Sequence, residues 1–248
     1  MNDDLIWHPS PDTWTLDATI VHLWSVELDQ PADVRAKFWK TLNDDERTRA
    51  NRFYFDHDRH HFIVARGVLR QLLANYLGIF PVNVVFDYGH NGKPLLDQQH
   101  HNNGRILEFN LSHAKGVGVI GFAWDRIVGV DVEKIRPLDD GPNIAKRFFS
   151  KSENEIFFSL PESEYPHAFF NCWTRKEAFI KAIGDGLTYP LDKFDVTLTP
   201  GKPARLISVE GSTAKAERWH LVSFFPMKDY VGALIAEGKN WTIKAFKW

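Results

Sequence analysis

The order of predicted helices and strands occurs twice along this chain of 248 residues. In the first half, a probable strand at 20–26 precedes a charged stretch and a long amphipathic helix. Asp56 or Asp58 is expected to cap the start of this helix, and Gly78 to end it. Its apolar stripe recurs with the helical period and consists of Phe62, Ala65, Leu69, Leu72, Leu73, Tyr76 and Leu77.

Strands follow each helix. After the first helix they are predicted at 84–88, 106–111 and 117–123, with a turn at Asn91-Gly92. The second half places a helix at about 168–183 before strands at 194–198, 219–224 and 230–236. Helix followed by several strands, found twice, predicts an α+β protein made of two similar α/β lobes. The boundary falls near 124–126, which gives an N-terminal lobe at 1–125 and a C-terminal lobe at 126–248.

Charge and cysteine content exclude several classes of protein. The formal net charge is −2, so no basic surplus indicates a nucleic-acid partner. Cys172 is the single cysteine, which rules out an internal disulfide or a cysteine zinc cluster. The acidic start, Met1-Asn-Asp-Asp4, lacks the basic and apolar regions of a signal peptide, and no apolar run reaches the ~20 residues of a membrane span. We expect a cytoplasmic protein without a membrane partner.

Carboxylates are concentrated in two segments of the second half. Asp131 and Glu133 lie two residues apart in the strand at 127–133, so both side chains share one face. Glu177 and Lys181 lie one turn apart in the second helix. Three hard oxygen donors on rigid elements suit Mg²⁺, whose remaining ligands are waters and substrate phosphates. A lysine beside them suits a reaction at a phosphate bond.

These two segments resemble the signature motifs of the 4′-phosphopantetheinyl transferases, in particular the large pseudo-dimeric Sfp type. The motifs are Gly129-Val-Asp-Val-Glu-Lys134 and Trp173-Thr-Arg-Lys-Glu-Ala-Phe-Ile-Lys181. Minor signatures of the family match in the same order: Gly92-Lys-Pro94, Phe109-Asn-Leu-Ser-His113, Lys146-Arg-Phe-Phe-Ser-Lys-Ser-Glu153 and Gly184-Asp-Gly-Leu187. The resemblance covers most of the chain from Arg47 to Phe194. It implies two lobes related by pseudo-twofold symmetry, with coenzyme A and Mg²⁺ bound between them.

The resemblance also implies a reaction. Such enzymes transfer the phosphopantetheine arm of coenzyme A to a serine of a carrier protein and release adenosine 3′,5′-bisphosphate. Asp131, Glu133 and Glu177 would hold the metal ion, and Lys181 would contact the pyrophosphate and assist departure of the leaving group. Glu177, or a metal-bound water beside it, would take the serine proton. Whether Glu177 acts as ligand, as base or as both stays open.

By the same resemblance, further residues would hold coenzyme A. The candidates are Arg49, Arg52, Lys93, Pro94, Ser112, His113, Asp131, Lys176 and Lys181. Two positions depart from the family pattern: Glu46 stands where some relatives have lysine, and His61 where arginine is usual. Neighbouring Arg47 or Arg59 would replace them at the 3′-phosphate.

Carrier proteins of fatty-acid, polyketide or nonribosomal-peptide pathways are the expected protein partners. They present an acidic surface beside the modified serine, so basic or apolar residues of the second lobe would bind them. The candidates for this surface are Lys146, Arg147, Lys151 and Phe157. Because a duplicated lobe places the subunit interface within one chain, we expect a monomer. Arg66 and Arg70 are expected to extend along their helix toward solvent, with Arg66 on a side from which it reaches a phosphate.

Two other functions share part of this residue pattern: a metal-dependent nuclease or phosphodiesterase, and a binding module without catalysis. Metal-dependent nucleases and phosphodiesterases also use clustered carboxylates with a lysine. One nuclease pattern needs that lysine two residues from an acid, whereas Lys134 directly follows Glu133 and faces the other side of the strand. A binding module that had lost catalysis is expected to lack a metal carboxylate or Lys181. All of these residues are present, so the sequence favours an active transferase.

Overall fold

The computed structural model describes residues 5–11, 14–101 and 104–248. The acidic amino terminus, on which the prediction of no signal peptide depends, lies outside the described residues. Within the described ranges, none of the helices has both the length and the apolar character required to cross a membrane.

The helices and strands are divided here at residue 124, the end of β6. Up to residue 124 they are β1 (Trp7–His8), β2 (Ile20–Glu27), α1 (Ala32–Thr41), α2 (Asp44–Asn51), α3 (Asp56–Leu77), β3 (Phe86–Tyr88), β4 (Pro94–Leu96), β5 (Leu107–Ala114) and β6 (Val117–Trp124). After it they are β7 (Val128–Lys134), α4 (Gly141–Phe148), α5 (Lys151–Ser159), α6 (Tyr165–Ile183), β8 (Phe194–Val196), β9 (Leu206–Val209), α7 (Thr213–Ala216), β10 (Trp219–Phe224), β11 (Tyr230–Glu237) and β12 (Thr242–Lys247). Short 3₁₀ turns lie at Pro81–Asn83, Gln98–His100, Glu162–Glu164, Gly186–Thr188 and Leu191–Lys193.

The ends of α3 test the capping predictions. Gly78 ends the helix in the left-handed conformation, with φ of 67°, and its N–H donates to the carbonyl of Ala74, as expected for a C-terminal glycine. The prediction for the start is wrong, because Phe55 occupies the N-cap position and no side chain caps the helix. Asp56 is instead the first helical residue, where its carboxylate pairs with Arg59 at 3.0 Å.

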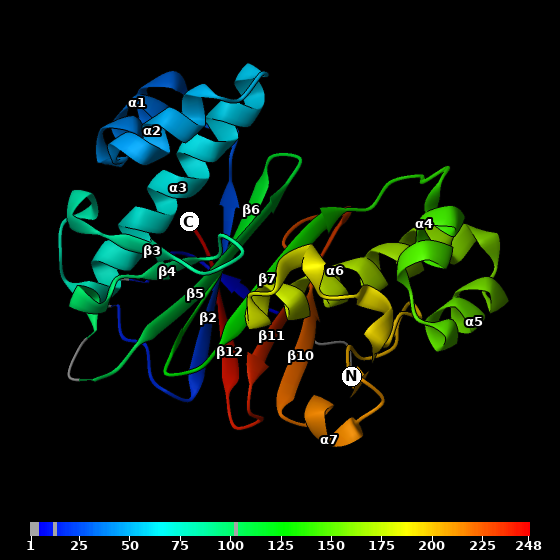
Figure 1. The fold of residues 1–248 in the computed structure, drawn as a ribbon. Helices are drawn as coiled ribbons and strands as arrows, with labels where there is room; N and C mark the ends of the chain where they lie inside the picture. Colours follow the sequence, from blue (N-terminus) through cyan, green and yellow to red (C-terminus); the bar gives the residue numbers. More distant parts are fainter. Residues whose placement is uncertain (1–4, 12–13, 102–103) are drawn as a thin grey trace.

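The strands form a five-stranded sheet in the order β1-β12-β2-β6-β5 and a three-stranded sheet in the order β10-β11-β7. Within these sheets, β2, β6 and β5 are antiparallel, as are β7, β11 and β10, whereas β12 runs parallel to β2. The last strand therefore joins the sheet of the first half. Figure 1 shows α1, α2 and α3 on one side of the strands and α4 and α5 on the other.

The two halves have the same connectivity. In each, a first strand leads through a long helix to an antiparallel pair, and the second strand of that pair hydrogen-bonds to the first strand of the unit. The two units are β2-α3-β5-β6 and β7-α6-β10-β11. The α+β class is thereby confirmed. The pseudo-twofold relation between the halves and the lobe boundary at 125 stay predictions.

Apolar packing follows this division. One buried cluster joins α3 to β2, β5 and β6, and a second joins α6 to β10 and β11. A third cluster lies between the two sheets and includes Leu23, Val130 and Leu234. Strands β5 and β7 meet beside this cluster without a regular ladder. There the side-chain oxygen of Asn110 accepts from the N–H of Val130 at 2.9 Å, so a side chain bridges the two halves where backbone pairing stops.

Gly129 sets the distance between β7 and α6. A Cβ at this position would overlap the carbonyl oxygen of Ala178 and lie 2.6 Å from the backbone nitrogen of Ala182. Both atoms belong to the helix backbone, which a rotamer change does not move. Because Asp131 and Glu133 follow on β7 while Glu177 and Lys181 lie on α6, this close approach brings the two halves of the carboxylate cluster together.

Replacing Gly129 by Ala is expected to lower the free energy of unfolding by about 2–3 kcal/mol, because the helix must shift away from the strand. Urea unfolding followed by circular dichroism measures the change. Gly89→Ala is the matched control, since the nearest atom to a Cβ there is the Lys93 carbonyl oxygen at 3.7 Å. Equal stability of the two variants would contradict the assigned role of Gly129.

Candidate active site

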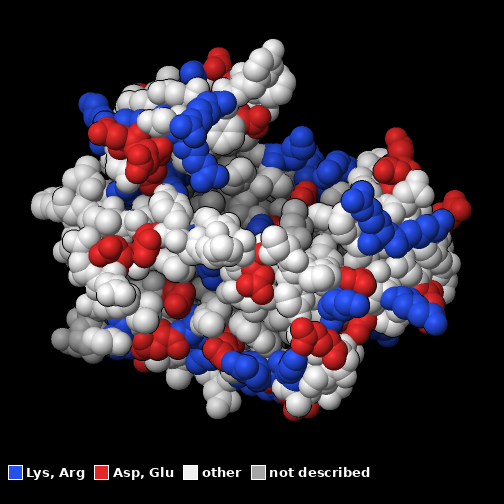
Figure 2. Space-filling view, in the orientation of Figure 1, with Lys and Arg blue, Asp and Glu red and all other residues white. Residues whose placement is uncertain are grey.

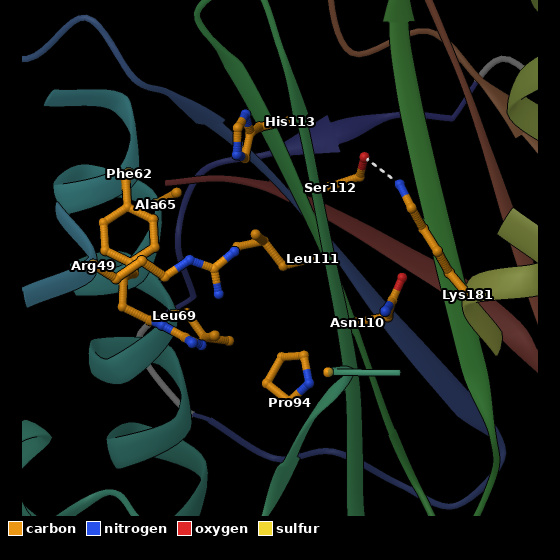
Figure 3. A pocket seen from close by; sticks show the side chains of 12 residues that line it. Arg49, Phe62, Ala65, Leu69, Pro94, Asn110, Leu111, Ser112, His113 and Lys181 are labelled. Atoms are coloured by element: carbon orange, nitrogen blue, oxygen red, sulfur yellow. Dashed lines mark hydrogen bonds between the residues drawn. The ribbon is translucent and has the colours of Figure 1, made fainter. Parts of the chain in front are cut away.

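A pocket of about 310 Å³ lies where α3 and β5 of the first half meet α6 of the second. Figure 3 shows side chains from the helix side facing Ser112 and Lys181 across this space. The pocket is lined by Arg49, Phe62, Ala65, Arg66, Leu69, Gly92, Pro94, Asn110, Leu111, Ser112, His113 and Lys181. These lining residues include three cations and no carboxylate, so the pocket suits an anionic ligand.

Asp131 adjoins the pocket through two lining residues, Ser112 and Lys181. Its carboxylate is buried, and Oδ1 accepts from Ser112 Oγ at 2.7 Å and from Lys181 Nζ at 2.5 Å. Lys181 also donates to Ser112 Oγ at 2.9 Å, the contact drawn in Figure 3. The second oxygen, Oδ2, has no hydrogen-bond partner among the described residues. A buried carboxylate oxygen left in this state favours a further cation.

Glu133 and Glu177 surround Asp131 with more negative charge. Burial raises the pKa of Glu177 to about 7, and the nearby Asp131 and Glu133 add to the rise while Lys181 opposes it. Burial, followed by the charge of Asp131, also raises the pKa of Glu133. Arg136 lies 3.5 Å from Glu133 and Lys181 pairs with Asp131, so two cations face three carboxylates. The cluster therefore carries excess negative charge, as a cation-binding site does.

The carboxylates are not gathered into a coordination sphere. Over the part of the chain that the structure describes, no three His, Cys, Asp or Glu side chains lie close enough together to hold a metal ion. The chemistry of the donors nevertheless fits Mg²⁺, because Asp131, Glu133 and Glu177 offer oxygen only and Asp131 Oδ2 is unsatisfied.

Most of the residues expected to bind coenzyme A lie at this pocket. Arg49, Pro94, Ser112, His113 and Lys181 line it. Asp131 lies behind Ser112. The structure does not bring Arg52 to the lining, although it caps the same α2 helix that carries Arg49.

Lys93 and Lys176 direct their ammonium groups away from the pocket. Lys93 Nζ donates to the carbonyl of Ala182 at 2.9 Å and so ties the β3–β4 hairpin to the end of α6. Lys176 is fully buried and pairs with Glu153 at 2.8 Å. It also donates to the carbonyls of Leu191 and Phe194. A ligand contact for Lys176 is therefore wrong, because its charge is already satisfied inside the protein core.

The residues that depart from the family pattern are also engaged elsewhere. Glu46 is buried between two arginines, and His61 Nε2 lies 2.8 Å from Asp29 Oδ1. Arg66 and Arg70 do not extend to solvent as expected, since both are buried. Arg66 nevertheless lines the pocket, on the side of the helix from which it was expected to reach a phosphate.

Asn110 also lines the pocket, although the sequence analysis did not include it among the expected site residues. A signal was available, because strand alternation places Asn110 on the same face of β5 as Ser112, within the quoted Phe109–His113 motif.

The surface expected to bind a carrier protein is only partly available. Lys146, Arg147 and Lys151 are exposed on α4 and at the start of α5. Figure 2 shows basic side chains in this region, on the right of the molecule. The expectation for Phe157 is wrong, since its side chain is 0% exposed and packs within the core of the second half.

Comparison with known proteins gives a consistent result for both halves. A family model described as "4'-phosphopantetheinyl transferase superfamily" matches residues 127–235, and one described as "4'-phosphopantetheinyl transferase, N-terminal" matches residues 30–122. The chain is 41% identical over 238 residues to the 4′-phosphopantetheinyl transferase HetI of Nostoc sp., covering 96% of each chain.

More distant relatives agree. The chain is 34% identical to the 4′-phosphopantetheinyl transferase psf-1 of Bacillus pumilus, covering 65% of this chain and 66% of the relative. It is 29% identical to the 4′-phosphopantetheinyl transferase Sfp of Bacillus subtilis, covering 71% of this chain and 76% of the relative. Identity that extends over nearly the whole length of HetI, together with a pocket that joins the two matched regions, leads to one conclusion: the chain belongs to the 4′-phosphopantetheinyl transferase superfamily and is a transferase of the Sfp type.

Proposed function

We propose that this enzyme transfers the 4′-phosphopantetheine arm of coenzyme A to a serine of an apo acyl, peptidyl or polyketide carrier protein, with Mg²⁺ required and adenosine 3′,5′-bisphosphate released. One observation supports the proposal most. At one end of a pocket whose other walls are basic and apolar, Lys181 pairs with Asp131, whose negative charge acts together with that of Glu133 on nearby Glu177. A pyrophosphate bond placed at that end meets a cation and a proton acceptor together.

The reaction forms one bond and breaks one bond. The serine oxygen attacks the phosphorus that carries the pantetheine group, and a new P–O bond forms as the serine proton leaves. The bond from that phosphorus to the bridging pyrophosphate oxygen breaks, and the electron pair departs with adenosine 3′,5′-bisphosphate. Transfer of this kind depends mainly on alignment and on neutralisation of charge.

Protein groups supply both requirements. Lys181 Nζ, held 2.9 Å from Ser112 Oγ and 2.5 Å from Asp131 Oδ1, would donate to the pyrophosphate and stabilise the negative charge on the leaving oxygen. Glu177, or a water held beside it, would accept the serine proton, since a carboxylate can serve as a ligand and as a base. Phe62 and Leu69 line the apolar part of the pocket, where they exclude water from the nucleoside.

Asp131, Glu133 and Glu177 would hold the Mg²⁺ ion. When bound, the ion would act as a Lewis acid at the pyrophosphate oxygens. The unsatisfied Oδ2 of Asp131 supports this set of ligands. The raised pKa values of Glu133 and Glu177 agree with it, since burial raises both and the negative charge of Asp131 raises them further.

The exposed basic residues Lys146, Arg147 and Lys151 remain the proposed contacts for the acidic surface of a carrier protein. A cytoplasmic, monomeric enzyme remains part of the same proposal.

Intact-protein mass spectrometry tests the proposal directly. Several apo carrier proteins are incubated with the enzyme, coenzyme A and Mg²⁺, and the mass of each carrier is followed over time. We expect a gain of one phosphopantetheine on at least one carrier, and an initial rate at least tenfold lower after chelation with EDTA and restored by excess Mg²⁺. A gain that EDTA leaves unchanged would contradict the metal requirement, and the absence of any gain would contradict the transfer.

A further inference from the structure

A buried charge network lies on the α3 side of the pocket. Glu46 of α2 is 2% exposed and lies between two arginines of α3. Its Oε2 accepts from Arg70 Nε at 2.7 Å, and its Oε1 lies 3.0 Å from Arg66 Nε. Both guanidinium groups also lie over the ring of Phe86, with Cζ at 4.6 Å for Arg66 and 5.2 Å for Arg70. One carboxylate thus serves two buried cations.

The two arginines are held to different degrees. Arg70 is fully buried and donates through Nη1 to the carbonyls of Pro81 and Val84, besides its bond to Glu46. Among the residues that the structure describes, Arg66 donates to the hydroxyl of Tyr88 at 3.1 Å, and its contact with Glu46 Oε1 lacks hydrogen-bond alignment. Arg70 is therefore a structural residue, whereas Arg66 lines the pocket.

Charge balance indicates what Arg66 faces. Two arginines against one carboxylate leave one positive charge, and Arg49 adds a second in the lining of the same pocket. Figure 2 shows basic side chains at the upper left of the molecule, next to a group of acidic ones. A charge of +2 matches a phosphate monoester dianion, and guanidinium groups bind phosphate oxygens with parallel hydrogen bonds.

The pocket has two cationic ends. Figure 3 shows Arg49 on the helix side and Lys181 on the opposite side. Coenzyme A carries two anionic groups, the pyrophosphate and the 3′-phosphate. Since the reacting pyrophosphate belongs beside the carboxylates and Lys181, the 3′-phosphate is left for the arginine end.

We propose that Arg66, positioned by Glu46, binds the 3′-phosphate of coenzyme A together with Arg49 and sets the preference of this enzyme for the 3′-phosphorylated nucleotide. The inference rests on the proposed function, because it takes coenzyme A as the ligand. It also accounts for the acid at position 46. Glu46 does not contact the ligand but orients Arg66, so α3 supplies a cation in addition to Arg49 of α2.

Isothermal titration with coenzyme A and with 3′-dephospho-coenzyme A, without any carrier protein, tests this inference. The ratio of the two Kd values reports the 3′-phosphate alone and does not change when a variant weakens both ligands equally. Arg66→Gln is expected to reduce the ratio about 10- to 100-fold, since a charge-assisted contact is lost. Arg66→Lys, which keeps the positive charge, is expected to retain part of the wild-type ratio. Glu46→Gln, which releases the guanidinium group of Arg66, is expected to reduce the ratio of Kd values about 3- to 10-fold. Lys37→Gln on the exposed face of α1 is the control and is expected to leave the ratio unchanged.

The outcomes separate this inference from the proposed function. A wild-type preference for coenzyme A that Arg66→Gln retains would overturn the role of Arg66 and leave the transfer reaction untouched. If the ratio falls for Arg66→Gln but is unchanged in a folded Glu46→Gln variant, Glu46 is not a positioning residue. Wild-type protein that binds neither ligand would overturn the proposed function as well.

Discussion

Replacing Glu177 by Gln is expected to lower the turnover number for phosphopantetheine transfer about 10³-fold while changing the Kd for coenzyme A less than about threefold. Gln preserves the size of the side chain but removes the negative charge that would bind Mg²⁺ and the basic oxygen that would take the serine proton. Losses of this order follow removal of a general base. Binding of coenzyme A depends on the basic and apolar walls, in which Glu177 has no part.

Turnover is measured by the mass gain of an apo carrier protein, and binding by titration without carrier. Glu217→Gln removes an equal charge from an exposed position at the end of α7 and is expected to behave as wild type. Turnover of Glu177→Gln within threefold of wild type would refute the assigned role. A parallel loss of binding and turnover would show instead that Glu177 supports the pocket.

Much of the fold was predictable because it depends on local patterns. The apolar stripe of α3 has a strict helical period, and Gly78 ends the helix as its position indicates. Strand alternation places Asp131 and Glu133 on one face of β7 without any knowledge of the tertiary fold. Pairing between strands far apart in the sequence could not be predicted from local patterns. The last strand, β12, joins the sheet of the first half by pairing with β2, more than 200 residues away.

The grouping of the motif residues was predictable from local spacing, whereas their roles stay predictions. Ser112, His113, Asp131, Glu177 and Lys181 belong to short motifs whose spacing fixes their direction on a strand or helix.

Prediction failed for residues whose roles depend on a distant partner. Arg66 and Arg70 were expected to reach solvent, because the network with Glu46 joins helices whose packing the sequence does not reveal. Phe157 and Lys176 failed for a similar reason, since the core of the second half buries both.

Lys176 is the sharpest example. Its neighbour Glu177 faces the site, and one residue along a helix turns the side chain by about 100° into the core. There Lys176 and Glu153 form a fully buried ion pair that is satisfied on both sides. Glu153 also accepts from the N–H groups of Ser150 and Val196, at 2.8 and 2.7 Å. The pair thereby joins α5, α6 and β8.

Replacing Lys176 by Met is expected to lower the free energy of unfolding by about 3–5 kcal/mol, because an unpaired carboxylate is left in the core. Burial already raises the pKa of Glu153 above its ordinary value of 4.5 although Lys176 opposes the rise, so removing Lys176 raises it further. A raised folded-state pKa means that the folded protein binds more protons than the unfolded chain. The stability of Lys176→Met should therefore recover as the pH falls from 7 toward 5, and the loss should be largest above neutrality.

Thermal and urea unfolding at several pH values measure this behaviour. Glu153→Gln combined with Lys176→Met is expected to be more stable at pH 7 than Lys176→Met alone and to lose the recovery at low pH, because Gln leaves no buried group to protonate. Lys193→Met is the control, since its side chain is 61% exposed and its loss leaves no buried charge. Equal stability of Lys176→Met and Lys193→Met would mean that the pair contributes nothing. Equal sensitivity of the single and double variants to pH would assign the recovery to another group.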